Sequence, residues 1–186
     1  MKNNLLFIIF FICQFCIGQE VYNSSDIKER SGLVFTQLHF SVPLWFNPDY
    51  PEENPITGEK DPFILPEGLS GRAGVGFHYD QWIGISINSG MDWKGSKCLV
   101  VAPLFGALRI SPQVGESLRI TAEAGYGKSF AIGRGGLVGD FKKASLGLES
   151  VEGGFGLYME FCQYGLTING EDNIRSLSLG ISVLMF

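Results

Sequence analysis

Basic residues, cysteines and long apolar segments are all scarce in this 186-residue chain. The 14 Lys and Arg residues are outnumbered by 19 Asp and Glu residues, which gives a net charge of −5 at pH 7. Nucleic-acid binding needs a basic surface that neutralises phosphates, so this composition argues against a nucleic-acid partner. The four cysteines are too few for a disulfide framework. After residue 18, no apolar segment reaches the ~20 residues that a membrane-spanning helix needs.

The first 18 residues are organised as a secretory signal peptide. Lys2 supplies the charged start, residues 5–12 form an unbroken apolar run, and Cys16 and Gly18 are the small residues before a cleavage site at Gln19. The apolar run is short for a spanning helix, which makes an uncleaved membrane anchor the less favoured alternative. We therefore expect the chain to be exported.

The C-terminal segment 174–186 alternates between apolar and small polar residues. A strand has a side-chain period of two, so one face of this strand is apolar and the other is small and polar. A soluble barrel would place the apolar face inside, whereas an outer-membrane barrel places it against lipid. The apolar residues are Leu177, Leu179, Ile181, Val183 and Met185, and the small polar ones are Ser176, Ser178, Gly180 and Ser182.

The rest of the chain shows similar alternation between turns, with no helical period longer than a few residues. Many of the 25 glycines fall inside the alternating segments, where they allow the bends of a small barrel. Strands that cross lipid must close into a barrel, because lipid cannot satisfy an open strand edge. We predict an all-β fold, a single antiparallel up-and-down transmembrane β-barrel. Its eight strands are expected at 33–46, 69–79, 82–90, 98–111, 117–130, 143–150, 153–165 and 174–186.

The predicted connections alternate in length. Three are short (80–81, 112–116 and 151–152) and four are long (47–68, 91–97, 131–142 and 166–173). Outer-membrane barrels join short periplasmic turns with longer outer loops, so the alternation favours that class. Aromatic residues near the two ends of the strands predict two interfacial girdles. One contains Trp45, Phe46, Trp93, Phe130 and Tyr164, and the other contains Tyr79, Trp82 and Phe186.

The strand parity assigns one set of side chains to lipid and the other to the lumen. Val75, Ile85, Leu157 and Ile181 are expected to face lipid. The interior of an eight-stranded barrel is only wide enough for side chains to fill it. Unpaired charges there would be costly, so inward charges should form ion pairs that plug the lumen. The expected network consists of Arg72, Arg119, Glu123, Glu149 and Glu160.

This pattern resembles the small eight-stranded outer-membrane barrels, such as the OmpA transmembrane domain and the OmpX-like proteins of Gram-negative bacteria. The resemblance covers the whole mature chain and rests on the strand pattern, the loop lengths and the terminal Phe186. It implies a cell outer-membrane location, with outer-membrane lipid and the barrel insertion machinery as partners and a monomeric state. The family's last strand keeps its apolar residues on the parity of the terminal aromatic. Here Gly180 and Ser182 have that parity, which implies a bulge near Leu184.

The predicted organisation is a signal peptide (1–18), a short N-terminal periplasmic segment (19–31) and an outer-membrane barrel (32–186). Cleavage of the signal leaves Cys98 and Cys162, on strands that are not adjacent, and we expect their thiols to be unpaired. The segment 47–68 has five prolines and six acidic residues against one lysine. Clustered carboxylates can bind a hard cation, but these have no fixed ligand spacing, so a solvated acidic surface loop is favoured.

Motifs for catalysis or cofactor binding are absent or incomplete. Residues 125–129 (GYGKS) end like a phosphate-binding loop, but Ala122 stands where its first glycine belongs. The sequence contains no G-x-S-x-G or H-E-x-x-H motif. His39 and His78 are isolated on the inward parity. We therefore predict no enzyme activity and no catalytic, cofactor or metal site.

The favoured function is a structural or surface-contact role in the outer membrane. One alternative is an exported lipocalin-like barrel that binds a small apolar ligand, with its strand faces inverted. The other is a lipid-modifying barrel enzyme. Nothing in the sequence identifies a ligand or a surface partner, or decides whether the lumen conducts.

Overall fold

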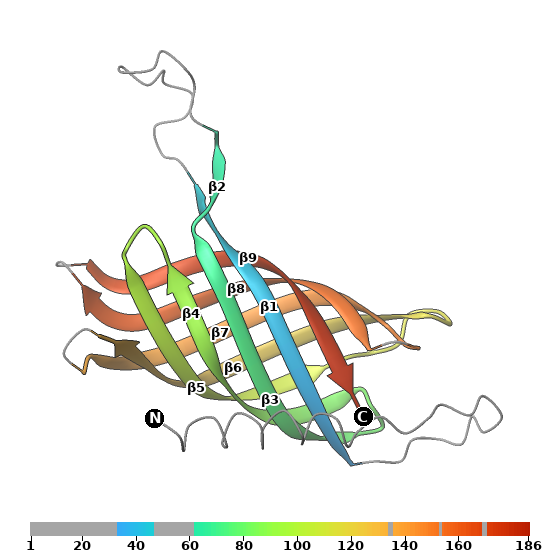
Figure 1. Cartoon of the computed structure of the whole chain (residues 1–186). Helices are drawn as coiled ribbons and strands as arrows, with labels where there is room; N and C mark the ends of the chain where they lie inside the picture. Colours follow the sequence, from blue (N-terminus) through green and yellow to red (C-terminus); the bar gives the residue numbers. More distant parts are fainter. Residues whose placement is uncertain (1–32, 47–61, 134–135, 153, 169–170) are drawn as a thin grey trace, which may run out of the picture. The chain divides into compact units, whose positions relative to one another are not determined.

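A computed structural model of the chain describes residues 33–46, 62–133, 136–152, 154–168 and 171–186. These residues form nine antiparallel strands (Figure 1). They are β1 (Val34–Phe46), β2 (Ile64–Pro66), β3 (Gly68–Tyr79), β4 (Ile83–Lys94), β5 (Leu99–Ile110), β6 (Leu118–Ile132), β7 (Val138–Ser150), β8 (Phe155–Ile168) and β9 (Glu171–Met185). The ladder runs from β1 through β3 to β9, and β9 pairs back with β1. The predicted all-β, eight-stranded, up-and-down barrel is thereby confirmed.

Among the described residues, no helix is long and apolar enough to cross a bilayer.

The short strand β2 was not predicted. It lies within the segment 47–68, which was expected to be a loop, and it pairs with the end of β1, where Phe46 is opposite Ile64. The β1–β3 ladder ends at Ser41 and Ser70, and β2 continues it along the same edge of β1 (Figure 1). Residues 47–61, with most of the acidic side chains of this segment, lie outside the described residues, and the acidic-loop interpretation stays a prediction.

The barrel has two ends, which we name by their connections. The terminal end carries Phe186 and the connections 80–82, 111–117 and 151–154, and the distal end carries the connections 95–98, 133–137 and 169–170. At the terminal end the strands begin and end within two residues of the predicted positions. At the distal end β4, β6, β7, β8 and β9 extend two to five residues further than predicted.

The predicted alternation of short and long connections is therefore wrong. The connections 95–98 and 169–170 have four and two residues, whereas 111–117, expected among the short ones, has seven. Near the distal end, outward positions become polar, as at Asp140, Lys142 and Arg175. The alternation of apolar and polar residues therefore ends there, although the hydrogen-bonded ladder of the strands continues.

Glycine inside a strand also displaced one predicted boundary. Gly90 was interpreted as the end of a strand, but β4 continues through it to Lys94. A Cβ atom at Gly90 would meet the carbonyl oxygen of Gly71 and the Cα of Arg72 on β3. Glycine at this position therefore serves the close approach of two strands and not a turn.

The predicted outward parity is confirmed. Val75, Ile85, Leu157 and Ile181 point away from the barrel and are 53%, 59%, 60% and 40% exposed. Two aromatic residues assigned to the girdles point inward instead. Tyr164 is 1% exposed, and the Phe186 ring packs against His78 with 4.9 Å between ring centroids.

The bulge near Leu184 is absent, so that prediction is wrong. β9 pairs with β1 without interruption from Leu177 to Met185, and Leu184 lies opposite Gln37. Phe186 therefore keeps the inward parity of Ser182 and lies beside Phe35 as well as His78.

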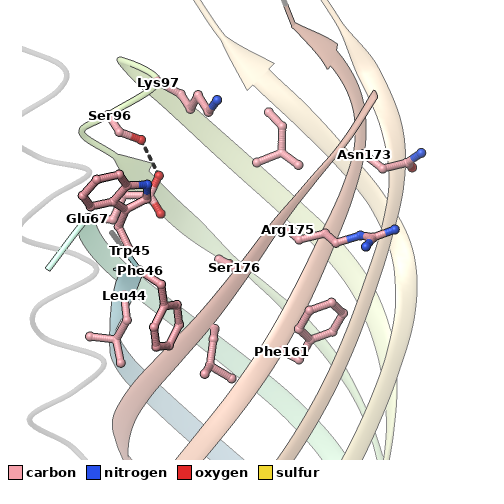
Figure 2. A pocket seen from close by; sticks show the side chains of 12 residues that line it. Leu44, Trp45, Phe46, Glu67, Ser96, Lys97, Phe161, Asn173, Arg175 and Ser176 are labelled. Carbon is pink, nitrogen blue, oxygen red and sulfur yellow. Dashed lines mark hydrogen bonds between the residues drawn. The ribbon is translucent and has the colours of Figure 1, made fainter. Parts of the chain in front are cut away.

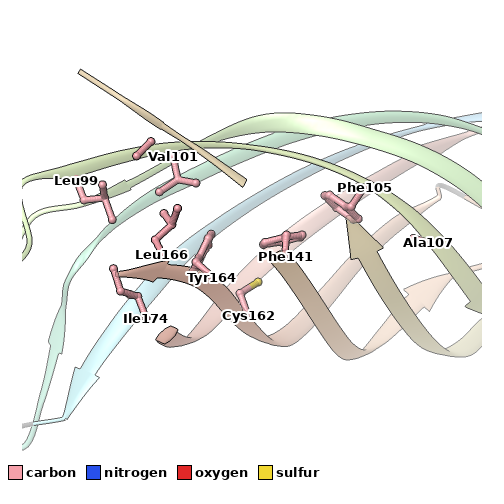
Figure 3. Close-up of a cluster of buried hydrophobic side chains, with 10 residues drawn as sticks. Leu99, Val101, Phe105, Ala107, Phe141, Cys162, Tyr164, Leu166 and Ile174 are labelled. Atoms are coloured by element: carbon pink, nitrogen blue, oxygen red, sulfur yellow. The ribbon is translucent and has the colours of Figure 1, made fainter. Parts of the chain in front are cut away.

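Near the distal end the interior contains an apolar cluster, next to the buried Asp92 and Lys94. Figure 3 shows Tyr164 between Leu166 and Phe141 in this cluster of inward side chains from β5 to β9. The ring centroids of Phe105 and Phe141 are 4.8 Å apart. β5, which the sequence showed to be apolar on both parities, buries Phe105 in this cluster and exposes Leu104 on the outer surface.

Gly127 tests the close packing of the barrel wall. A Cβ at this inward position would meet the carbonyl oxygen of Leu104 and the Cα of Phe105, which are both backbone atoms. We expect Gly127→Ala to lower the free energy of unfolding of the refolded protein by about 1–3 kcal/mol, the usual cost of overpacking. Unfolding in urea, followed by tryptophan fluorescence, measures this loss. Gly106→Ala is the control, because its Cβ would have no neighbour closer than 3.9 Å, and equal losses for both variants would contradict the packing argument.

Candidate functional site

The polar interior of the barrel is the candidate site. Its charged side chains are all 7% exposed or less: Arg72, Asp92, Lys94, Arg109, Arg119, Glu123, Lys143, Glu149 and Glu160. A charge that is removed from water needs an opposite charge and hydrogen bonds to offset the loss of hydration. The geometry of these pairs therefore decides what the interior can do.

Arg72 on β3 is the centre of the largest cluster. Its guanidinium donates two parallel hydrogen bonds to Asp92 on β4, Nε to Oδ1 at 3.0 Å and Nη2 to Oδ2 at 2.9 Å. Its Nη1 donates to Oε2 of Glu160 on β8 at 2.8 Å. The hydroxyl groups of Tyr164 and Ser41 donate to Asp92 and Glu160 at 2.7 and 2.8 Å. Each carboxylate is thus held by a cation and by a neutral donor.

Lys143 on β7 is the centre of a second cluster. Its Nζ donates to Oε1 of Glu123 at 2.8 Å and lies 3.6 Å from Oε2 of Glu160. The same Nζ is 3.3 Å from Nδ1 of His39, whose ring lies 5.0 Å from that of Tyr158. Glu160 therefore joins the Arg72 and Lys143 clusters into one network that crosses the interior.

Three further cations lie in the same interior. Lys94 on β4 places its Nζ 4.8 Å from the centroid of the Tyr164 ring. Arg109 on β5 donates from Nη2 to Oε2 of Glu149 on β7. Arg119 on β6 donates from Nη2 to the side-chain oxygen of Gln81 at 2.6 Å, in the turn between β3 and β4. Asp80 and Gln81 have φ values of 51° and 58°, as in a type I′ hairpin turn, so this turn presents the Gln81 side chain to the barrel interior.

The five predicted network residues are all buried, but they do not form one network with each other. Arg72 and Glu160 are paired directly, whereas Glu123 and Glu149 pair with Lys143 and Arg109, which are not among the predicted network residues. Arg119 pairs with no carboxylate among the described residues and binds Gln81 instead.

Four charged residues of the interior were missed, for identifiable reasons. Asp92 and Lys94 lie beyond the predicted end of their strand, and continuing the period of two past Gly90 would have placed both on the inward parity. Lys143 was read as the start of a strand, although Val138 begins it. Arg109 was not assigned to the interior because its strand is apolar on both parities, so the sequence did not show which parity faces inward.

The two histidines are engaged inside the barrel. His39 lies beside Lys143 and Tyr158, as described above, and His78 accepts a hydrogen bond at Nδ1 from the backbone N–H of Gln81 at 3.2 Å. Cys98 is exposed and Cys162 is buried, and no disulfide joins these two described residues, as predicted. Within the described residues, no group of His, Cys, Asp or Glu side chains is arranged to hold a metal ion.

A pocket of about 840 Å³ opens where the β1–β9 ladder ends. Figure 2 shows Trp45 and Phe46 on one side of it and Asn173 and Arg175 on the other. Its floor continues onto Phe161 and neighbouring apolar residues of the outer surface. The end of the barrel seam thus combines apolar surface with an exposed cation.

No protein-family model matches this chain, and no curated protein matches its sequence.

The Arg72 cluster gives a direct test of the interior ion pairs. Arg72→Met leaves Asp92 without its paired cation and leaves Glu160 with Lys143 alone. Removing one partner of a buried ion pair in this way lowers the free energy of unfolding by about 3–5 kcal/mol. We expect a loss of that size in the free energy of unfolding, measured in urea by tryptophan fluorescence. Arg72→Met combined with Asp92→Leu should recover part of this loss, because Asp92 no longer lacks its cation, while Glu160 keeps only Lys143.

The matched control for this test is Lys128→Gln. Lys128 and Asp140 form an ion pair at 2.6 Å, but both side chains are about half exposed. We expect no measurable change, since exposed pairs contribute little. Equal losses in the buried and exposed variants would contradict a special role for the interior pairs.

Proposed function

We propose that this chain is an integral outer-membrane β-barrel protein with a structural or surface-contact role and a lumen filled by its own side chains. The observation that carries the proposal is the apolar outer surface. Large apolar side chains are exposed on every strand of the barrel, among them Phe77, Ile87 and Leu146 at more than 60%. Soluble monomers rarely expose contiguous apolar patches larger than a few hundred Å².

The inner surface supports the same proposal. Lipid-facing and lumen-facing residues alternate in outer-membrane barrels, with the polar set inside. Here Glu123 and Glu160 are 5% and 1% exposed, while Ile85 and Leu157 on the opposite parity face outward. Outer-membrane lipid and the insertion machinery are the partners that this arrangement needs, and the proposed state is a monomer.

The first test is membrane integration. We expect the protein to stay with the membrane fraction after a carbonate wash at high pH, because its outer surface is apolar around the whole barrel. A closed ladder should also resist SDS until the sample is boiled, so the gel mobility of boiled and unboiled samples should differ. Release by carbonate together with an unshifted band would contradict the proposal and favour the exported lipocalin-like barrel.

The filled lumen is argued from the side chains that meet inside the barrel. Arg72, Glu160 and Lys143 form ion pairs across it, and Phe105 and Phe141 pack against each other nearer the distal end. An eight-stranded barrel has an interior just wide enough for such side chains. We therefore propose that the protein is not a general porin.

A lumen filled by side chains should conduct few ions, and this can be measured. In planar bilayers, the purified and refolded wild type should show no large, persistent open conductance. Phe105→Ala combined with Phe141→Ala removes two rings from the interior and should produce small conductance steps. Ile87→Ala, on the outer surface, should remain quiet. A wild type that conducts strongly and steadily would refute the filled lumen while leaving the membrane location intact.

The proposal is of a protein without enzyme activity. His39 contacts Lys143 and Tyr158, and His78 accepts a hydrogen bond from the Gln81 backbone, so both rings already have partners inside the barrel. Lipid A mass spectra from cells with and without the protein test this: a lipid A modification that depends on the protein would overturn it.

A further inference from the structure

The exposed charges of the described residues are distributed unevenly between the two ends of the barrel. Lys128, Lys142 and Arg175 are exposed on the distal parts of β6, β7 and β9. The terminal-end connections carry exposed acidic residues instead, Asp80, Glu116 and Glu152. At the distal end the exposed charges of the described residues are therefore these three cations and one carboxylate, Asp140, which is paired with Lys128.

Two of these cations lie close together. Lys142 is opposite Gln163 on β8, and Gln163 is opposite Arg175 on β9, so all three side chains share the outward face. With neighbouring strands about 4.8 Å apart, the Cα atoms of Lys142 and Arg175 are roughly 10 Å apart. Neither cation is in direct ion-pair contact with a carboxylate of the described residues; Asp140 lies near Lys142 but is paired with Lys128. Arg and Lys both bind phosphate oxygens, and they can converge on one placed over Gln163.

An apolar groove begins directly below this row. The next outward residues on the same three strands are Ala144, Phe161 and Leu177. They line a groove of about 470 Å³ that continues across β6 and β5 to Ala124 and Leu108. The groove is lined mainly by apolar residues, and the cation row lies one outward position beyond its Ala144, Phe161 and Leu177 end. Together they fit a molecule with an anionic head and a hydrocarbon tail.

We propose that Lys142 and Arg175 bind the phosphate of a phosphate-bearing membrane lipid in the leaflet at the distal end, with one acyl chain lying in the groove. The inference rests on the membrane location proposed above and specifies the lipid that this surface binds. Charge complementarity selects a lipid as the occupant over a second copy of the chain. A symmetric contact between two copies at this face would bring the same unpaired cations together.

The experiment uses the refolded full chain in vesicles of neutral phosphatidylcholine that contain a minor fraction of phosphatidic acid. Native mass spectrometry of the gently extracted protein counts the lipids that remain bound. We expect phosphatidic acid to be enriched over its share in the vesicles. Lys142→Gln combined with Arg175→Gln should weaken the binding of phosphatidic acid by about 30-fold. Each of the two basic residues contributes a similar share of the binding free energy to an anionic lipid, and the double variant loses both shares.

Two further variants make the test specific. Lys128→Gln removes a cation from the same end of the barrel, but one that is already paired, and it should weaken binding much less. Ala124→Leu fills the groove without changing a charge and should also displace the bound lipid. If the double variant retains as much phosphatidic acid as the wild type, or if Lys128→Gln loses as much as the double variant, the proposal is wrong.

The outcomes separate this inference from the membrane proposal. A chain that inserts into neither neutral nor anionic vesicles contradicts the membrane location itself. A chain that inserts equally well into both and retains no excess of phosphatidic acid overturns only the lipid site. Inorganic phosphate that displaces the lipid at millimolar concentration would show a simple anion site without a contribution from the groove, which would also overturn the proposal.

Discussion

The pairing of β1 with β9 is the constraint on which the rest of the structure depends. This pair closes the barrel, with Ser41 opposite Gly180 in a continuous register. Arg72 on β3 reaches Glu160 on β8 only because the wall between them is closed through β1 and β9. The contact between Lys143 on β7 and His39 on β1 depends on the same closure. In an open sheet these side chains would face solvent on strands far apart in the ladder.

The register also decides which side chains need partners. A shift of one residue in a strand moves all its side chains to the opposite face. Such a shift in β8 would move Glu160 to the outer surface and bring Leu157 and Met159 inside. The buried pairs add little net stability of their own, since their desolvation offsets much of the attraction. Their effect is to make other registers costly, because each of these would leave a buried charge without its partner.

Different interactions dominate the inner and the outer surface of the barrel. Inside, ion pairs and hydrogen bonds occupy the middle of the barrel, and nearer the distal end an apolar cluster packs beside Asp92 and Lys94. Outside, exposed apolar side chains cover the strands, and the outward positions become charged only near the distal end. The proposed functions follow from this division: the outer surface meets lipid, the inner surface fills the lumen, and the boundary between apolar and cationic residues near Arg175 selects the lipid.

The sequence by itself determined the strand-rich class, the eight barrel strands and the two faces, because a period of two is a local property of the backbone. It therefore placed Val75 outside and Arg72 inside correctly. It did not determine where the strands end near the distal end, because Asp140, Lys142 and Arg175 interrupt the hydrophobic period while the hydrogen-bond ladder continues. Nor could it identify the ion-pair partners. Arg72 meets Asp92 and Glu160, and Glu149 meets Arg109, only after closure sets the register and brings distant strands across one narrow interior. The inward course of Phe186 was decided in the same way, since the uninterrupted β1–β9 pairing leaves no extra residue to turn its ring outward.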